Sequence, residues 1–214
     1  LYQEAARRNV RVLVDCFFKE LKRDERWTCL GKDGQPGRDI YCWNSDGFMN
    51  AIKEEIRTAT DLVGDYPSFA GFYMDEPRFW GGWCEICQER FREYLKGKYT
   101  EGELKALGID EPDKVTAPFA AARDTEKVLW MEHEMFREHT MLGVFRELMD
   151  HMRTLKQDAR LCVTINPDVS PARIGQLVDI LSCDWYGRGE LRQAFNMDLY
   201  WSTAGRSMIA AIGV

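Results

Sequence analysis

Five short apolar runs, separated by helical stretches or long connections, are the feature of this sequence that most constrains its fold. The runs are Val10 to Phe17, Phe69 to Met74, Leu161 to Ile165, Asp179 to Asp184 and Ser207 to Val214. Their length and composition predict buried strands. Because strands that alternate with helices form parallel sheets with right-handed crossovers, we expect an α/β fold.

The spacing of apolar residues predicts helices between these strands. We expect them from Ser45 to about Val63, Cys84 to Tyr99, Glu101 to Leu107, Thr125 to Gln157 with a break near Gly143, Ile174 to Leu177, and Leu191 to Thr203. The stretch after the first strand is rich in glycine and contains a proline, so we expect a polar loop there.

The length of 214 residues, 45% of them hydrophobic, is enough for one sizeable core. A complete (β/α)8 barrel of the TIM type takes about 250 residues. We therefore expect an incomplete barrel, a single domain over residues 1–214 that is truncated at both ends. The net charge of −6, with scattered basic residues, argues against nucleic acid or a membrane as the partner.

Glu76 is the strongest catalytic candidate. It follows an apolar strand and precedes Pro77, and partial burial there raises the pKa of a carboxyl toward the range of a general acid. The side chain of Asp75 points to the other side of the strand. The alternative is that both carboxylates open a surface loop or cap the next helix.

Aromatic and polar residues gather at the predicted strand ends, where both barrels and open α/β sheets bind ligands. Aromatic faces stack on sugar rings and carboxylates bind hydroxyls, so the combination indicates a carbohydrate site. Packing at the rim is the alternative for each aromatic residue taken singly. The candidate substrate-binding residues are Asp75, Trp80, Asn166, Asp184 and Tyr186. No glycine-rich phosphate-binding turn follows a strand, so we expect no organic cofactor.

Four of the seven cysteines lie outside the predicted strands. Cys84 and Cys87 have the spacing of a zinc knuckle, and Cys29 and Cys42 supply a second pair. Such a zinc site would be structural. Disulfides, either Cys29–Cys42 or Cys84–Cys87, and free thiols are the alternatives. Zinc in place of disulfides favours a reducing, cytoplasmic setting.

Two histidines, His133 and His139, lie six positions apart, whereas the metalloprotease motif His-Glu-x-x-His needs four. We interpret the segment from Met131 to His139 as a solvated helical face with charge pairs.

Three motifs together resemble a known family. They are Tyr41-Cys42-Trp43-Asn44-Ser45, the strand that ends in Glu76, and the Cys-x-x-Cys-x-x-x-Phe-Arg-x-Tyr-Leu-x-x-Lys-Tyr pattern from Cys84 to Tyr99. Residues from about 39 to 99 thereby resemble family 42 β-galactosidases and their relatives among retaining (β/α)8 glycoside hydrolases. The resemblance implies that Glu76 is the acid/base at the end of barrel strand four and that the five strands are strands three to seven.

The resemblance also implies a zinc loop, an insertion over about residues 19–44. The family's cluster takes one cysteine from the Tyr-Cys segment, matched by Cys42, and three from a Cys-x-Cys-x-x-Cys turn. Cys84 and Cys87 match two of these, whereas Gly82 stands at the position of the first. We expect Cys29 to replace it as the fourth ligand.

Two departures from the family accompany these matches. The family has Asn before the acid/base, in contact with the sugar 2-hydroxyl, whereas this chain has Asp75, which when ionised accepts hydrogen bonds but cannot donate them. The family nucleophile is a Glu at the end of strand seven, and this sequence ends at Val214 before such a residue. A retaining mechanism needs two carboxyl groups about 5 Å apart, so we expect the partner carboxylate outside this chain.

The resemblance therefore predicts a β-galactosidase-like O-glycosyl hydrolase of carbohydrate metabolism that acts on a β-linked sugar. A second interpretation is a non-catalytic carbohydrate-binding or structural barrel that has lost activity. A third is a fragment that works only within a homo-oligomer.

Overall fold

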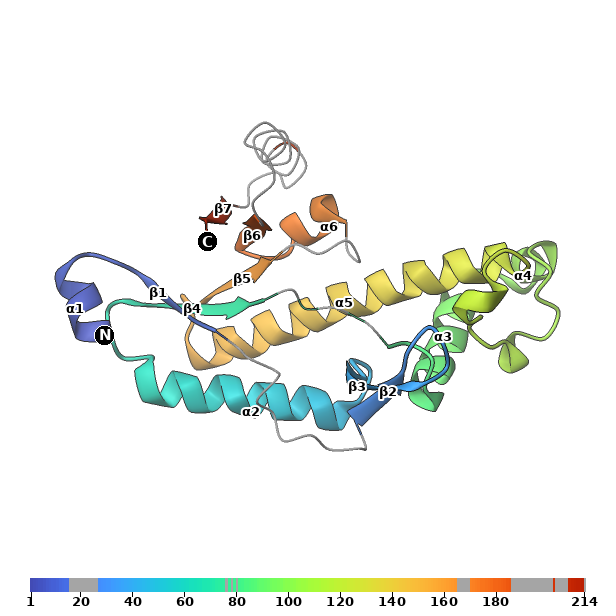
Figure 1. Ribbon diagram of the computed structural model, residues 1–214, viewed down its shortest axis with the longest axis horizontal. Helices are drawn as coiled ribbons and strands as arrows, with labels where there is room; N and C mark the ends of the chain where they lie inside the picture. Colours follow the sequence, from blue (N-terminus) through green and yellow to red (C-terminus); the bar gives the residue numbers. More distant parts are fainter. Residues whose placement is uncertain are drawn as a thin grey trace. The chain divides into compact units, whose positions relative to one another are not determined.

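The main sheet of the protein has five parallel strands in the order β1-β4-β5-β6-β7 (Figure 1). They are β1 (Val12–Asp15), β4 (Phe69–Met74), β5 (Arg160–Thr164), β6 (Ile180–Trp185) and β7 (Met208–Gly213). The computed structural model describes residues 1–15, 27–75, 77, 79, 81–164, 170–185, 202 and 208–213. The predicted α/β fold with a parallel sheet is confirmed, and its five described strands are fewer than the eight of a complete barrel.

The described helices lie close to the predicted positions. They are α1 (Tyr2–Arg7), α2 (Asp46–Val63), α3 (Glu85–Lys98), α4 (Glu101–Ala106), α5 (Lys127–Leu155) and α6 (Pro171–Gly175), with short 3₁₀ turns at Pro112–Lys114 and Ala120–Ala122. The predicted break of α5 near Gly143 is wrong, because buried neighbours such as Val144 and Phe145 hold the helix together there. The helix expected from Leu191 to Thr203 lies outside the described residues except at Ser202.

A small antiparallel sheet replaces part of the predicted polar loop. Its strands are β2 (Thr28–Leu30) and β3 (Pro36–Tyr41). Gly34 takes φ +76°, and the Asp33 side chain accepts a hydrogen bond from the Gln35 backbone N–H at 3.1 Å. The expectation of a loop without strands is wrong here because an Asp-Gly pair favours a hairpin turn.

The chain divides into two compact units. The first comprises residues 1–21, 51–78 and 142–214 and contains the main sheet. The second comprises residues 22–50 and 79–141 and contains the β2–β3 hairpin, α3 and α4. The single domain expected over residues 1–214 stays a prediction.

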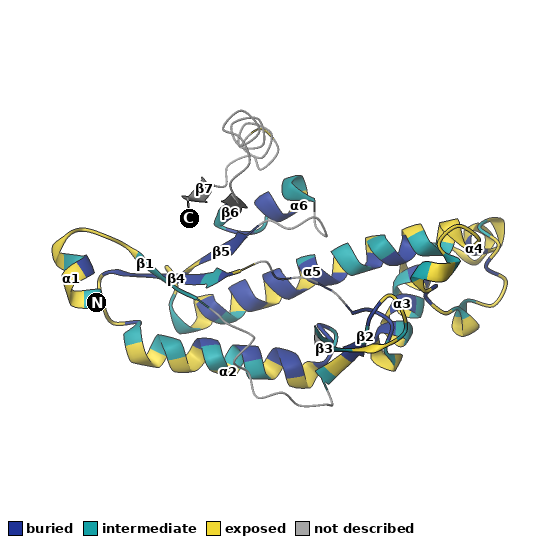
Figure 2. Ribbon diagram, viewed as in Figure 1, coloured by how far each residue is buried: buried dark blue, intermediate teal, exposed yellow. Residues whose placement is uncertain are grey.

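The first unit is built around β4, which is buried along almost its whole length (Figure 2). Burial on both faces is typical of a strand within a parallel sheet. Beside the sheet, α2 and α5 are joined by an ion pair between Lys53 and Glu147 (2.6 Å). A hydrogen bond between the His151 ring and the Lys53 carbonyl (3.0 Å) adds a second link. These two links hold α2 and α5 together within the first unit.

The second unit has its own hydrophobic core. Its members are Trp83, Phe91, Leu95, Leu104, Ile109, Ala117 and Phe136. Beside it, the buried carboxylate of Glu132 accepts hydrogen bonds from Lys98 Nζ (2.6 Å) and Tyr99 Oη (2.7 Å). Burial alone would lower the pKa of Lys98, but the hydrogen bonds to Glu132, Tyr99 and Tyr94 together outweigh the burial and raise that pKa. This ion pair joins α3 to α5.

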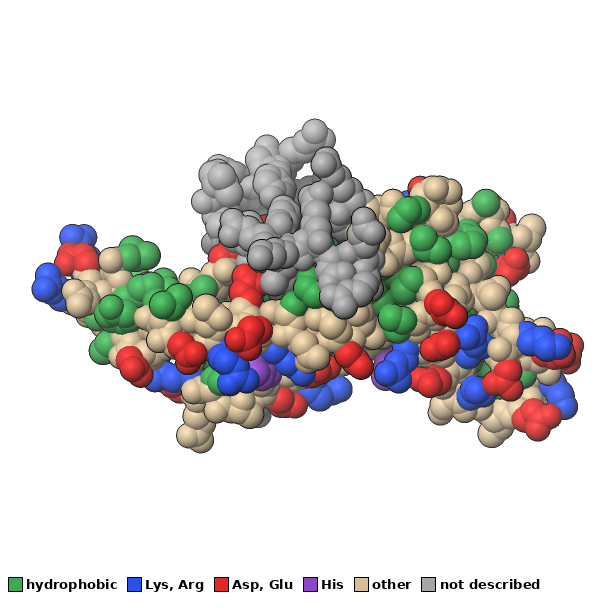
Figure 3. All heavy atoms as spheres, turned by 90° about the horizontal axis from the view of Figure 1, so that it is seen from below, with side chains coloured by type: hydrophobic (Ala, Val, Ile, Leu, Met, Phe, Trp, Pro, Cys, Tyr) green, Lys and Arg blue, Asp and Glu red, His purple; other side chains and the backbone are tan. Residues whose placement is uncertain are grey.

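The charged side chains of the described residues are interspersed by sign on the face shown in Figure 3. Ion pairs such as Lys96–Asp113 (2.6 Å) and Lys105–Glu101 (2.8 Å) are part of this pattern. Among the helices of the described part, none is long and apolar enough to cross a membrane.

Two glycine-to-alanine substitutions are expected to act in opposite directions. Gly143 is exposed within α5, and nothing lies within 4 Å of where a Cβ would be, so Gly143→Ala should raise the free energy of unfolding by about 0.5–1 kcal/mol. Gly71 has φ +132°, and a Cβ there would collide with the Arg160 backbone, so Gly71→Ala should destabilise. Urea unfolding followed by circular dichroism measures both. Effects of the same sign would contradict this account of the two positions.

Candidate functional site

The first candidate region is the carboxyl end of β4. Asp75 follows the strand directly and is exposed, and its Oδ1 accepts a hydrogen bond from the Tyr73 hydroxyl at 3.3 Å. Glu76 is the next residue in the sequence and lies outside the described residues, so its role as acid/base stays a prediction.

A row of hydroxyl groups leads from Asp75 into the sheet. The Tyr73 hydroxyl lies 2.5 Å from Thr164 Oγ1, which lies 2.9 Å from Ser182 Oγ. Thr164 and Ser182 are buried, so the row runs across β4, β5 and β6 within the first unit. Because an ionised carboxylate only accepts, Tyr73 donates to Asp75 and turns its own oxygen toward Thr164. This network was missed from the sequence, where its signal is two hydroxyl residues inside apolar strands.

The other candidate substrate-binding residues are not tested by the structure. Asp184 lies in β6, near the carboxyl end of that strand, in agreement with the predicted position. Trp80, Asn166 and Tyr186 lie outside the described residues. Their contacts with a sugar stay predictions.

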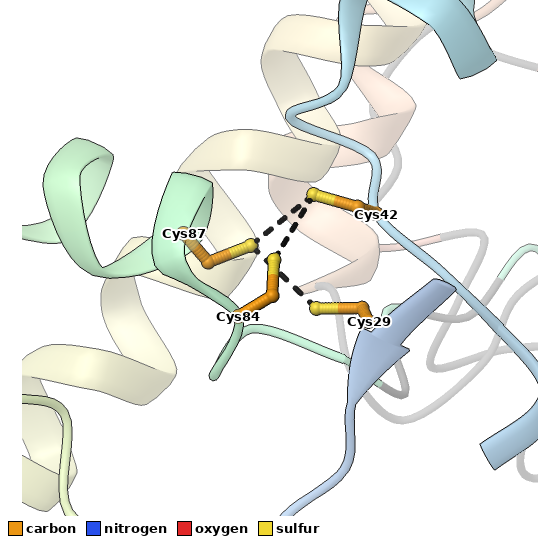
Figure 4. A group of neighbouring side chains, drawn as sticks. All are labelled: Cys29, Cys42, Cys84 and Cys87. Carbon is orange, nitrogen blue, oxygen red and sulfur yellow. Dashed lines mark hydrogen bonds between the residues drawn. The ribbon is translucent and has the colours of Figure 1, made fainter. Parts of the chain in front are cut away.

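The second candidate region is a cluster of four cysteines, in the second unit (Figure 4). Cys29 comes from β2, Cys42 follows β3 directly, Cys84 is the N-cap residue of α3 and Cys87 lies in its first turn. Their sulfur atoms all lie within 4.8 Å of one another. The structure thus brings together the four cysteines that the sequence indicated.

The distances within the cluster fit a metal ion and not disulfides. The sulfur of Cys42 lies 3.5 Å from those of Cys84 and Cys87, and Cys29 Sγ lies 3.8 Å from Cys87 Sγ. A disulfide has its sulfurs about 2.05 Å apart, and all four cysteines are free thiols. A tetrahedral ion with metal–sulfur bonds of about 2.3 Å separates its ligands by about 3.8 Å. The four sulfurs could therefore hold one such ion with little movement.

Two N–H groups donate to sulfurs of the cluster. The Gly82 backbone N–H lies 3.2 Å from Cys29 Sγ, and Asn44 Nδ2 lies 3.4 Å from Cys87 Sγ. The hydrogen bond from Cys42, with that of Gly82 acting in the same direction, lowers the pKa of Cys29. The hydrogen bond with Cys29 raises the pKa of Cys87 in turn. A bound divalent cation would displace the remaining protons, so metal affinity should rise with pH.

The two glycines before Cys84 explain why Cys29 is the fourth member. A Cβ at Gly81 would lie 2.7 Å from both Cβ and Sγ of Cys29, so the missing side chain leaves the space that Cys29 fills. Gly82 has φ +124°, and a Cβ there would face the His133 ring at 3.1 Å. A cysteine side chain at Gly82 would therefore begin in tight contact with the His133 ring, and φ +124° would strain it.

The interpretation of Met131 to His139 as a solvated face is wrong for three residues, one of which, Phe136, is 2% exposed and belongs to the hydrophobic core of the second unit. His133 is fully buried and Glu132 is 7% exposed. The His133 ring packs against Trp83 and Phe91, with centroids 4.6 Å and 5.3 Å away, and its Nε2 lies 3.0 Å from the Gly82 carbonyl oxygen. Burial lowers the pKa of His133 to about 4, so the neutral ring donates to Gly82 and supports the turn that contacts Cys29.

Comparison with known proteins supports the fold. No protein-family model and no curated protein matches the sequence. A β-galactosidase from the psychrophilic Marinomonas ef1 matches the structure with a TM-score of 0.80 over 99% of this chain at 15% identity. A catalytic mutant of Gan42B, a GH42 β-galactosidase from G. stearothermophilus, matches with 0.78 over 94% at 17% identity. An agarase, AgWH50C, matches with 0.63 over 92% at 13% identity.

These likenesses concern the fold, because the sequence identities are low. The chain covers 39% of the Marinomonas protein, 35% of the Gan42B mutant and 31% of the agarase, so it spans about a third of the length of these structures. The structural likeness to GH42 β-galactosidases agrees with the resemblance that the sequence motifs indicated.

Gly81→Ala is expected to weaken metal binding by the cluster. The new Cβ would overlap Cys29 and push its sulfur away from the other three. Gly97→Ala is the matched control, since Gly97 lies in α3 and nothing lies within 4 Å of where its Cβ would be. Titration with cobalt(II), followed by its ligand-field absorption, measures the affinity. Equal affinity in the two variants would contradict the packing argument.

Proposed function

We propose that this chain is the part of a retaining glycoside hydrolase barrel that carries the acid/base carboxylate, Glu76. The observation that carries the proposal is a Glu placed in the sequence just beyond the end of β4, in a chain whose fold matches β-galactosidases. Active sites of such barrels lie at the carboxyl ends of the strands. The substrate class that fits is a β-linked sugar, with β-galactosides first.

In this proposal Glu76 acts twice. It protonates the glycosidic oxygen as the bond to the leaving group breaks, and it then takes a proton from the water that releases the sugar. The nucleophile would be a second carboxylate about 5 Å away.

Asp75 would bind a sugar hydroxyl beside the reacting bond. Tyr73 donates to its Oδ1, which leaves the other oxygen to accept a hydrogen bond from the substrate. Trp80 and Tyr186 would stack on sugar faces, while Asn166 and Asp184 would bind further hydroxyls.

Glu76→Gln in the complete protein is expected to lower kcat/KM on phenyl β-galactoside by about 10²–10⁴-fold, because the amide cannot protonate the leaving oxygen. The loss should be much smaller on the 2,4-dinitrophenyl glycoside, whose leaving group needs no proton. The alkaline fall of the rate, caused by deprotonation of Glu76, should disappear. Steady-state kinetics over pH with both substrates measures these effects.

Glu85→Gln is the matched control, since Glu85 is an exposed residue in the first turn of α3. A Glu76→Gln protein with the full rate on phenyl glycoside would overturn the assignment. A complete protein that binds galactosides but hydrolyses none would favour the non-catalytic barrel.

We further propose that the four cysteines bind structural zinc. Four thiolates in a closed arrangement suit zinc, whereas tetrahedral iron is the other ion that such ligands take. No position is left open for water, so the ion would pin the hairpin to α3 and take no part in hydrolysis.

Protein purified without chelators should contain about one zinc per chain, the stoichiometry of a four-cysteine site. Cys29→Ser should lose most of the zinc because it removes one of the four ligands. Cys162→Ser should keep the zinc, since Cys162 is a buried thiol in β5 outside the cluster. Elemental analysis by mass spectrometry measures zinc and iron together. Iron in place of zinc, or neither metal, would refute this part of the proposal.

A further inference from the structure

The four cysteines of the cluster differ in their access to solvent. Cys29, Cys42 and Cys87 are at most 1% exposed, whereas Cys84 is partly exposed. Cys84 precedes α3 with an extended backbone, and its side chain makes no cap hydrogen bond to the helix. A reagent in solution therefore meets the sulfur of Cys84 before the other three.

The four sulfurs also differ in their hydrogen bonds. N–H groups of Gly82 and Asn44 donate to the sulfurs of Cys29 and Cys87. Such bonds withdraw electron density from sulfur and make it a weaker nucleophile. Within the described part of the chain, no N–H group is seen to donate to the sulfur of Cys42 or Cys84. The sulfur of Cys84 is therefore accessible to reagents in solution and keeps its nucleophilic strength, because no N–H group of the described part is seen to donate to it. The sulfur of Cys42 is buried and is not accessible to reagents.

We propose that Cys84 is a modification site, at which hydroperoxides and soft electrophiles open the cluster and release its metal. The release of metal rests on the proposed zinc site, whereas the order in which the cysteines react does not. With a hydroperoxide, the Cys84 thiolate attacks one peroxide oxygen. An S–O bond forms, the O–O bond breaks and the alkoxide leaves with a proton from solvent, which gives a sulfenic acid.

Cys42 is the residue placed to complete the reaction. Its sulfur lies 3.5 Å from that of Cys84 and is free to attack the oxidised sulfur (Figure 4). An S–S bond then forms, the S–O bond breaks and hydroxide leaves as water. Overall two thiols lose two electrons and two protons, and the peroxide becomes an alcohol and water. Cys29 and Cys87 remain, too few to hold a structural metal.

The test uses the complete protein, after its zinc content has been measured. The protein is treated with limiting hydrogen peroxide, free thiols are then blocked with N-ethylmaleimide, and disulfides are mapped by peptide mass spectrometry. A chelating dye follows the release of zinc. We expect the Cys42–Cys84 disulfide first, one zinc released for each disulfide, and recovery with dithiothreitol and added zinc.

Alkylation tests the solvent access of the four cysteines independently of oxidation. With iodoacetamide, Cys84 should react at least roughly tenfold faster than the other three cysteines, as expected for a partly exposed thiol among buried ones. In Cys42→Ser the sulfenic acid at Cys84 should persist and be trapped by dimedone. Cys162→Ser should leave the order of reaction unchanged.

The outcomes separate the two proposals. A first disulfide that does not include Cys84, or faster alkylation of any buried cysteine, would overturn the modification site while leaving the zinc content intact. A first disulfide between Cys84 and Cys87 would overturn the role of Cys42. Protein without zinc in which Cys84 still reacts first would support the modification site and overturn the metal proposal. Disulfide mapping of the wild-type protein tests the modification site at Cys84 even if the Cys42→Ser protein does not fold.

Discussion

The contact among four cysteine sulfurs links the two chain segments that make up the second unit. It joins a short hairpin to the start of α3, and Cys29 and Cys87 are 58 positions apart in the chain. A metal ion bound by the four sulfurs would add to the stability that the hydrophobic core of this unit supplies. The turn through Gly81 and Gly82 serves this contact twice. It leaves space for Cys29, and it presents an N–H to its sulfur.

Regular elements with strong periodicity could be predicted from the sequence. Phe69 to Met74 is apolar or aromatic at every position, as expected for a strand buried within the sheet, and α2 carries the apolar spacing of a helix with one buried face. The β2–β3 hairpin could not be predicted from apolar pattern, because its strands are short and largely polar. Its local signal is the turn around Asp33 and Gly34.

The cysteine cluster could be predicted as a list of residues and less so as an arrangement. The cysteine spacing identified all four sulfurs, whereas the reason for Cys29 lies in the backbone at Gly81, which no spacing shows. The burial of His133 depends on Trp83 and Phe91, which come from a distant part of the chain. The row from Tyr73 to Ser182 depends on the register of three strands, which sequence pattern leaves undetermined.

The hairpin also has a consequence for the order of folding. The backbone N–H of Cys42 bonds to the Trp27 carbonyl (2.7 Å), so the hairpin brings Cys29 and Cys42 together through local contacts. Cys84 and Cys87 meet within the first turn of α3. Each pair therefore closes with a small loss of chain entropy, whereas joining the two pairs closes a much longer loop. A metal ion captured by one pair would complete its coordination only when the other pair arrives, so we expect the rate-limiting event in this unit to be the encounter of two preformed halves.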